Sequence, residues 1–267
     1  MNQTASIRLL FITGTDTGVG KTVLTSLLLN HLRRRKVPAL AIKPFCSGSR
    51  ADAQLLHDLQ QGDLTLDEVN PFYFSEPLAP LVAARKQARS IGLAQTLAHL
   101  HSIVRRLPRF EVEGKESRMG RPVLLIEGAG GLLVPLGPQY FVLDLIRKLR
   151  CEVIVVARNK LGTLNHTLLT IQALRNACPH AGKNRFARHR AQRSNSFSSD
   201  RYSRPKVVLM QQKRGDFSAA SNAATLSELL APVSLWKLPF LGGDLQSPAV
   251  IQKIEKKIEK TLAQILD

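Results

Sequence analysis

Residues 8–22 read RLLFITGTDTGVGKT, and this stretch decides the fold. Residues 8–13 form an apolar run typical of a buried strand, and the glycine-rich residues 14–20 follow it. Residues 21–32 then repeat apolar side chains at helical spacing. A strand, a glycine-rich loop and a helix in this order direct backbone N–H groups and a helix N-terminus at an anion. The stretch therefore predicts a phosphate-binding loop.

The end of this loop carries most of its chemistry. The Lys21 ammonium is expected to reach the β- and γ-phosphates of a nucleotide, and the Thr22 hydroxyl suits Mg²⁺. Five residues, rather than the usual four, separate Gly14 from Gly20-Lys21, so either Gly14 is displaced by one position or Thr15 takes the place of the first glycine. The other loop and helix residues expected to bind ATP are Thr17, Gly18, Val19, Gly20 and Val23.

The rest of the chain alternates between strand-like and helical patterns. Further strands are predicted at residues 39–42, 123–126, 152–156, 207–210 and 235–238. Further helices are predicted at residues 51–60, 91–106, 165–176, 221–230 and 249–266, and the proline-containing residues 70–80 are expected to form an ordered loop. This alternation predicts an α/β fold of the P-loop NTPase type, with a doubly wound, mostly parallel sheet and helices on both faces. We expect residues 1–267 to form a single domain.

Charge is the unusual feature of the composition. The chain has 38 Lys and Arg against 20 Asp and Glu, a net charge of +18. Residues 183–206 alone contain eight basic residues and one acidic residue, without a periodic apolar face. We interpret this segment as an irregular, solvated insertion. Two alternatives stay open, namely an RNA- or membrane-binding patch and an artefact of the gene model.

Other sequence features indicate a cytoplasmic protein. No apolar run approaches the roughly 18 residues of a membrane helix. The N-terminus lacks the flanks and length of a signal peptide. The three cysteines, Cys46, Cys151 and Cys178, are odd in number and have no metal-ligand spacing, so we expect reduced thiols rather than a disulfide scaffold.

A second candidate site lies in residues 123–131, VLLIEGAGG. A buried strand would deliver Glu127 to the carboxyl edge of the sheet, where ligands bind in open α/β folds. There the carboxylate could help to hold Mg²⁺, while Gly128, Ala129 and Gly130 leave room for the nucleotide. The alternative is a glycine-rich turn with a solvated Glu127.

Six short blocks in the same order resemble the dethiobiotin synthase family. They are the loop at 14–22, KPFCSGS at 43–49, NPF at 70–72 with Pro77 and Pro80, EGAGG at 127–131, KLGTLNH at 160–166 and PFL at 239–241. The extra residue of the phosphate loop is similar to the family's own longer loop. The resemblance implies closure of a cyclic urea from 7,8-diaminononanoate, CO₂ and ATP, which yields dethiobiotin, ADP and phosphate.

The resemblance also implies residue roles. Lys43 would be catalytic together with Lys21, and Asp52 would join Thr22 and Glu127 around Mg²⁺, although Asp52 could instead be a helix cap. The substrate would contact Thr17, Ser47, Pro80, Leu161 and Asn165, the last two from the other subunit of a homodimer. The adenine side would involve Gln211, Pro239, Phe240 and Leu241, where Gln211-Gln212 replaces the family's Asn-Asp pair.

Two rival functions remain. A partition-type P-loop ATPase usually has a second lysine near the start of the loop, but positions 15 and 16 are Thr and Asp. A nucleic-acid-binding ATPase switch is suggested by the charge of +18 alone, and we do not expect a nucleic-acid or membrane partner. Asn159-Lys160-Leu161-Gly162 resembles the guanine-binding motif of GTPases but lacks its acidic residue.

Overall fold

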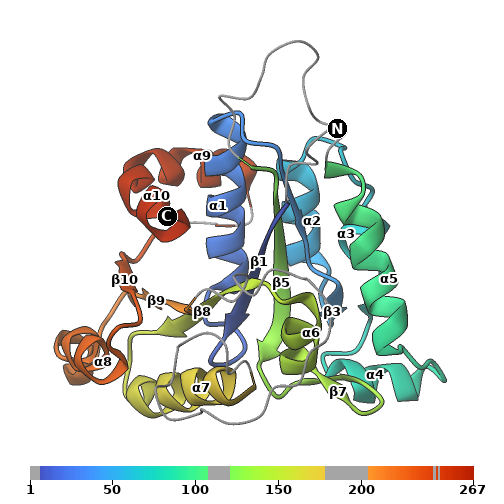
Figure 1. The fold of residues 1–267 in the computed structure, drawn as a ribbon. Helices are drawn as coiled ribbons and strands as arrows, with labels where there is room; N and C mark the ends of the chain where they lie inside the picture. The colour runs from blue at the N-terminus through green and yellow to red at the C-terminus, as the bar shows by residue number, and fades with distance from the viewer. Residues whose placement is uncertain (1–6, 108–120, 178–203, 243–244, 246) are drawn as a thin grey trace, which may run out of the picture.

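The structure is a computed structural model that describes residues 7–107, 121–177, 204–242, 245 and 247–267. Its described part contains a six-stranded sheet in which every neighbouring pair of strands is parallel (Figure 1). From edge to edge the strands are β10 (Leu235–Leu238), β9 (Lys206–Met210), β8 (Glu152–Arg158), β1 (Arg8–Gly14), β5 (Val123–Gly131) and β2 (Ala39–Ile42).

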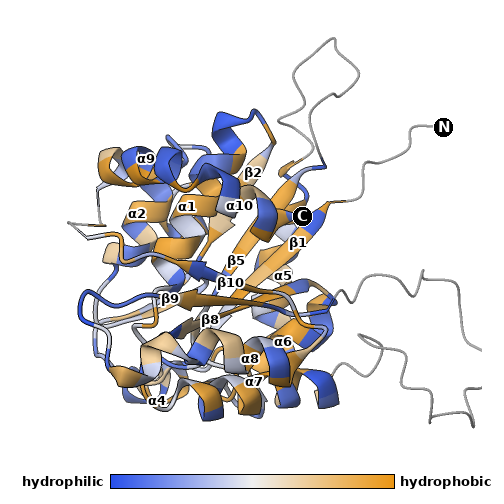
Figure 2. Ribbon diagram, turned by 90° about the vertical axis from the view of Figure 1, so that its left-hand side faces the viewer, coloured by the Kyte–Doolittle hydropathy of each residue, from blue (hydrophilic) through white to orange (hydrophobic). Residues whose placement is uncertain are grey.

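Helices cover both faces of this sheet (Figure 2). One layer contains α1 (Lys21–Arg34), α2 (Ala51–Leu59), α9 (Pro248–Lys257) and α10 (Glu259–Leu266). The opposite layer contains α6 (Val142–Leu149), α7 (Thr163–Ala177) and α8 (Asn222–Leu230). Shorter elements complete the described chain: β3 (Phe45–Ser47), α3 (Leu66–Val69), β4 (Phe72–Phe74), α4 (Pro80–Lys86), α5 (Leu93–Val104), β6 (Pro135–Gly137), β7 (Tyr140–Phe141) and the 3-10 helix η3 (Phe217–Ala220).

The central strands are apolar because helices exclude water from both of their faces. In β1, Leu10, Phe11 and Ile12 are at most 1 % exposed, and Ile154 and Val155 of β8 are completely buried. These side chains join the apolar sides of the helices in one continuous core. The predicted α/β fold with a parallel sheet and helices on both faces is therefore confirmed.

The order of the strands also indicates where a ligand-binding site lies in the sheet. The connection from β1 through α1 leads to β2 at one edge, whereas α6, α7 and α8 lead the chain from β5 toward β10 at the other edge. The direction of winding therefore reverses beside β1. In open α/β sheets, ligands bind at the carboxyl ends of the strands at such a point. The phosphate loop after β1 and Lys43 after β2 both lie at this edge.

Some local expectations were wrong. Residues 249–266 form two helices, because Ile258 has non-helical dihedral angles and α10 turns to contact β10 while α9 packs on α1 and α2. Residues 70–80 are not only loop, since β4 pairs in parallel with β3. The antiparallel β6–β7 pair and α6 were not predicted. The break at Ile258 and the β3–β4 pair depend on contacts with distant parts of the chain, whereas the β6–β7 pair is a local hairpin that leads directly into α6.

The basic segment at 183–206 falls mainly outside the described residues. Its last residue, Lys206, begins β9, so the end of the segment is strand rather than irregular chain. Of the three cysteines, Cys46 is a buried free thiol, Cys151 is buried, and Cys178 lies outside the described residues. Within the part of the chain that the structure describes, no helix is long and apolar enough to cross a membrane.

Candidate active site

The phosphate loop is held between β1 and α1. The backbone N–H of Thr15 donates to the carbonyl of Val156 at 3.0 Å, which ties the loop to β8. Gly20 has a φ of 103°, and a Cβ atom there would lie 3.0 Å from Cε of Met210. Glycine at position 20 therefore satisfies both a left-handed backbone and close contact with the end of β9.

Lys21 is the first residue of α1, and its side chain turns back along the loop. The residue is 6 % exposed, and Nζ donates to the carbonyl oxygen of Asp16 at 2.9 Å. Burial disfavours the charged form and lowers the pKa of Lys21 to about 8. A phosphate group bound in the loop would place a negative charge next to this ammonium.

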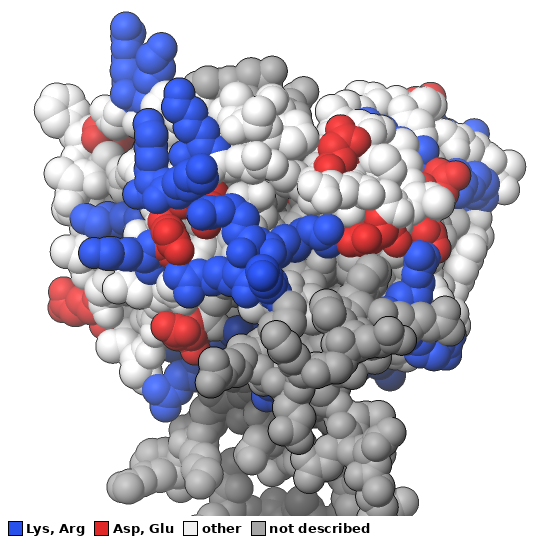
Figure 3. Space-filling model, turned by 90° about the horizontal axis from the view of Figure 1, so that it is seen from above, with Lys and Arg blue, Asp and Glu red and all other residues white. Residues whose placement is uncertain are grey.

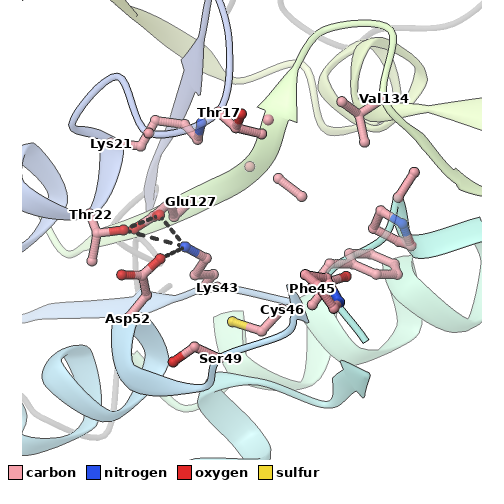
Figure 4. A pocket seen from close by; sticks show the side chains of 18 of the residues that line it. Thr17, Lys21, Thr22, Lys43, Phe45, Cys46, Ser49, Asp52, Glu127 and Val134 are labelled. Atoms are coloured by element: carbon pink, nitrogen blue, oxygen red, sulfur yellow. Dashed lines mark hydrogen bonds and ion pairs between the residues drawn. The ribbon is translucent and has the colours of Figure 1, made fainter. Parts of the chain in front are cut away.

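Three oxygen-bearing side chains from three elements surround the Lys43 ammonium (Figure 4). Lys43 Nζ lies 2.8 Å from Glu127 Oε1 and 3.3 Å from Thr22 Oγ1, and it forms an ion pair with Asp52. The Thr22 hydroxyl also donates to Glu127 Oε1 at 2.6 Å. We call Thr22, Asp52 and Glu127 the oxygen cage.

The backbone around Lys43 is fixed by the residues that precede β4. The N–H of Lys43 donates to the carbonyl of Val69 at 2.9 Å, and the Asn70 amide donates to the carbonyl of Lys43 at 2.8 Å. Arg50 in turn donates to Asn70 Oδ1 at 3.0 Å. The Asn-Pro-Phe block of the sequence therefore positions Lys43 rather than contacting the cavity itself.

Charge and burial act in opposite directions within this cluster. Burial alone would lower the pKa of Lys43, but the carboxylates of Glu127 and Asp52 outweigh it and raise that pKa. Burial likewise opposes ionisation of Asp52, yet the Lys43 ammonium holds the pKa of Asp52 below its ordinary value. Burial raises the pKa of the neighbouring Cys46 to about 12, so this thiol stays protonated at neutral pH.

One cavity of about 590 Å³ gathers most of the predicted site residues. The predicted residues that line it are Thr17, Gly18, Gly20, Lys21, Thr22, Val23, Lys43, Ser47, Asp52, Pro80, Glu127, Gly128, Ala129 and Gly130. One cavity is thus lined by residues of the phosphate loop, by residues at the acidic end of β5 and by Lys43. The sequence analysis expected these residues to lie together. Asp52 is the second residue of α2, whose N-cap is Arg50, so the alternative of a helix cap for Asp52 is wrong.

Other predicted residues lie outside this cavity. Val19 and Leu161 line a hollow of about 50 Å³ together with Arg158. Asn165 is exposed on α7. Gln211 follows β9 and accepts a hydrogen bond from the Asn159 amide at 3.0 Å. Pro239, Phe240 and Leu241 follow β10.

The cavity also contains residues that the sequence analysis did not assign. These are Phe45, Cys46, Ser49, Pro77, Leu78, Ala79 and Val134. A signal was present for several of them, because the KPFCSGS and proline blocks were both noted. Their contact was not foreseeable from spacing, since a Cβ atom on Gly48 would lie 3.0 Å from Cβ of Pro77, which is 29 positions away.

The oxygen cage fits a hard divalent cation. Mg²⁺ prefers oxygen ligands, and the cage supplies one hydroxyl and two carboxylates. The buried Oε2 of Glu127 has no hydrogen-bond partner, so the carboxylate retains capacity for a ligand. In the described residues, no three His, Cys, Asp or Glu side chains form a metal-binding group, and the cage combines two carboxylates with a hydroxyl.

The parallel sheet, the glycine-rich loop before α1 and the acidic end of β5 define a P-loop nucleotide-binding protein. The fold is similar to that of a chain in the solved MinC:MinD cell division protein complex of Aquifex aeolicus, with a TM-score of 0.50. The two chains are 10% identical in sequence, and the match covers 97% of this chain and 92% of the other. Residues 8–184 match the family model described as an AAA domain.

Named relatives show to which family of P-loop proteins the chain is similar. The ATP-dependent dethiobiotin synthetase BioD of Bacillus licheniformis is 43% identical over 61% of this chain and 65% of that protein, just under two thirds of its length. The protein of the same name from Anaeromyxobacter dehalogenans is 39% identical over 66% of this chain and 75% of that protein. The chain belongs to the dethiobiotin synthetase family.

Proposed function

We propose that this chain is an ATP-dependent ligase that converts 7,8-diaminononanoate and CO₂ into dethiobiotin, with release of ADP and phosphate. The observation that carries the proposal is the convergence of Lys21, Lys43 and the oxygen cage on one cavity. The reaction brings together a triphosphate and a carbamate, which are both anionic. Fixed cations around such groups stabilise the charge that develops in the transition state.

The proposed reaction has three steps. One amine of the substrate adds to CO₂ and loses a proton, which forms a carbamate. A carbamate oxygen then attacks the γ-phosphorus, and the bond to the bridging oxygen breaks so that ADP leaves. The second amine attacks the carbamate carbon and loses a proton, and phosphate leaves as the cyclic urea closes.

Different residues of the cavity have different roles in the proposed reaction. The backbone N–H groups of the loop and the Lys21 ammonium bind the phosphates. Lys43 neutralises the carbamate and the transferred phosphoryl group. Thr22, Asp52 and Glu127 would hold Mg²⁺, which supplies further positive charge beside the phosphates. Ser47 and Pro80 line the substrate side of the cavity.

The adenine side is proposed at the ends of β9 and β10. Gln211, Pro239, Phe240 and Leu241 follow these strands, and Met210 beside them is in close contact with Gly20 of the phosphate loop. The Gln211 side chain is held by Asn159, which is itself 1 % exposed and accepts a hydrogen bond from Asn222 at 2.9 Å. This network supports a fixed amide at the edge of the base site.

A homodimer is part of the proposal. Leu161 and Leu169 are 79 % and 61 % exposed, and both lie at the β8–α7 side of the molecule. Exposed leucines on one side are consistent with a surface that a second copy covers. In such a dimer Leu161 and Asn165 would contact the substrate bound to the other subunit. A cytoplasmic location stays a prediction.

On one face of the described residues, acidic partners accompany the basic side chains, which does not favour a nucleic-acid switch there. Figure 3 shows a face where Lys and Arg side chains gather with Asp and Glu among them. At the C-terminal end of α1, Arg33 pairs with Asp63 at 2.6 Å, Arg34 pairs with Glu255, and Arg35, the residue after the helix, pairs with Glu259 at 2.8 Å. Cations that already have acidic partners attract a polyanion less strongly.

The test is product formation by the purified full-length chain. Dethiobiotin and phosphate should appear only when the diamine, bicarbonate, ATP and Mg²⁺ are all present, and EDTA should stop the reaction until Mg²⁺ is restored. Phosphate release that depends on nucleic acid and not on the diamine would contradict the proposal. Lys43→Ala should lower turnover by about 100-fold or more while circular dichroism stays unchanged. Near-normal turnover would remove Lys43 from the mechanism.

The single domain with an insertion is also a proposal. Residues 183–203 carry six basic residues and one acidic residue, so their deletion should lower the net charge from +18 to +13. We expect the deleted chain to keep its thermal unfolding transition and its turnover. Loss of salt-dependent RNA binding on deletion would instead support the patch interpretation, and a native protein whose intact mass lacks these residues would support the gene-model interpretation.

A further inference from the structure

Lys43 occupies the position where a divalent cation would be expected. Its ammonium lies among the same three side chains that supply oxygen ligands, with Nζ 2.8 Å from Glu127 Oε1 and 3.3 Å from Thr22 Oγ1. Asp52 completes the contact as an ion pair. Lys43 is only 8 % exposed and Glu127 only 1 %, so the contact between these two side chains is shielded from solvent.

The cage has room for one cation at a time. The carboxylates of Asp52 and Glu127 carry two negative charges, of which the ammonium neutralises one. Mg²⁺ binds oxygen at about 2.0–2.1 Å. An ammonium and Mg²⁺ that both contacted Glu127 Oε1 would lie close together and repel each other strongly, because buried charges are poorly screened.

The cavity beside the oxygen cage has space for the displaced ammonium. Lys43 itself lines the space of about 590 Å³, together with Lys21 of the phosphate loop and Ser47 on the substrate side. Figure 4 shows the Lys43 side chain entering the cluster from one side, with Glu127 and Thr22 across from it. A rotation of its flexible side chain would move Nζ from the cage into this space.

We propose that the Lys43 ammonium is a resident placeholder in the oxygen cage, and that the divalent cation arriving with the nucleotide displaces it toward the reacting groups. The proposal rests on the proposed function, because it assigns the released ammonium to the carbamate and the transferred phosphoryl group. Before the nucleotide binds, the ammonium pairs with the buried carboxylate of Glu127 and the half-exposed carboxylate of Asp52. Afterwards the cation does so, and Lys43 becomes available for the substrate.

Competition between the two cations gives a counter-intuitive prediction. Loss of the lysine that turnover needs should improve metal binding by the nucleotide-free protein. Mn²⁺ replaces Mg²⁺ as the probe, and free Mn²⁺ is measured by electron paramagnetic resonance in the absence of nucleotide and substrate. Lys43→Met should bind Mn²⁺ tighter by about tenfold or more than the unchanged protein, whereas Lys43→Arg should not.

Lys21→Met is the matched control. It removes another buried lysine of the same cavity, whose Nζ donates to the Asp16 carbonyl rather than to the cage. Its effect on Mn²⁺ affinity should be much smaller. Adding Asp52→Asn to Lys43→Met should cancel the gain. Unchanged Mn²⁺ affinity in a folded Lys43→Met protein, or an equal gain in Lys21→Met, would overturn the proposal.

A second measurement needs no substitution. In protein labelled with ¹⁵N at lysine, a protected ammonium signal assigned to Lys43 should persist with ADP and EDTA and disappear when Mg²⁺ is added to the ADP complex. Its persistence with saturating Mg²⁺ and ADP would also overturn the proposal. Neither readout uses the diamine or turnover, so failure of the dethiobiotin assay would refute the proposed function and the role of the released ammonium, while the displacement of Lys43 by the cation would be judged by these two readouts alone.

Discussion

Lys21 and Lys43 share a cavity, but their ammonium groups lie in different electrostatic environments. Lys21 donates to a backbone carbonyl, whereas Lys43 contacts two carboxylates. Burial therefore lowers the pKa of Lys21 to about 8, while the carboxylates raise the pKa of Lys43. Two lysines of the same chemical type are thus prepared for different tasks, one awaiting a phosphate and the other already paired.

The lowered pKa of Lys21 leads to a prediction about proton uptake. Below pH 8 the group is charged in the nucleotide-free protein, and above it the group is largely neutral. The phosphates of ADP favour the charged form, so binding at about pH 9 should take up part of a proton, whereas binding at about pH 7 should take up almost none. Calorimetric titration with ADP in buffers of different ionisation enthalpy measures this uptake. Lys21→Met should show none at either pH, and equal uptake in that variant would contradict the assignment.

At the scale of elements, the junction of β1, the phosphate loop and α1 depends on Gly20. Alanine there would face both a left-handed φ of 103° and the Met210 side chain 3.0 Å away. We expect Gly20→Ala to lower the free energy of unfolding by about 1–2 kcal/mol and to weaken ADP binding. Gly62→Ala is the matched control, since Gly62 has a φ of 87° but nothing within 4 Å of its added Cβ. It should be destabilised without losing ADP binding, and similar ADP affinities for the two variants would refute the role of Gly20.

The contact between α1 and α9 contains a buried acid. Glu255 is completely buried on α9, where it pairs with Arg34 and lies 2.8 Å from Nδ1 of His31, while Asn30 is 3.4 Å away. Removal of one partner from such a group leaves uncompensated polar atoms in the core.

Glu255→Ala should therefore lower the free energy of unfolding by about 3–5 kcal/mol in urea titrations. Glu259→Ala offers a comparison, because it removes the exposed partner of Arg35 in the next helix. That variant should unfold at nearly the same urea concentration as the unchanged protein. Equal destabilisation of the two variants would show that burial of Glu255 is not what anchors α9.

At the scale of the whole molecule, the proposed dimer makes a distinct prediction. Leu169→Asp places a charge on α7 where the leucine is 61 % exposed, so the isolated subunit should remain folded. If a second copy covers this side, the substitution should weaken association by about tenfold or more and lower turnover. Light scattering after size-exclusion chromatography measures the mass.

Leu229→Asp on α8 is the control for that experiment, because Leu229 is a similarly exposed leucine at 53 %. It should leave the mass and the turnover unchanged. A monomeric unchanged protein with full activity, or a Leu169→Asp protein that remains dimeric, would remove the dimer from the proposal.

Local sequence sufficed for the main elements and for fourteen of the twenty-one residues that line the cavity. The loop at 14–22, the acidic end of β5 and the apolar strands were predictable, because each rests on short-range patterns of glycine, charge and hydrophobicity. The break at Ile258 and the β3–β4 pair were not, because they depend on α10 meeting β10 and on Phe72 donating to the Pro44 carbonyl at 3.0 Å.

The sequence by itself determined the strands of the central sheet, most of the larger helices, the phosphate loop and the family resemblance that implied roles for Lys43 and Asp52. Only the tertiary structure decided that the Lys43 ammonium lies inside the oxygen cage and that Asn70 holds its backbone. The physical reason is that hydrogen bonds and ion pairs act over a few ångströms in space. Residues 43 and 127 are far apart along the chain, and only the packing of β2 beside β5 brings them within that distance.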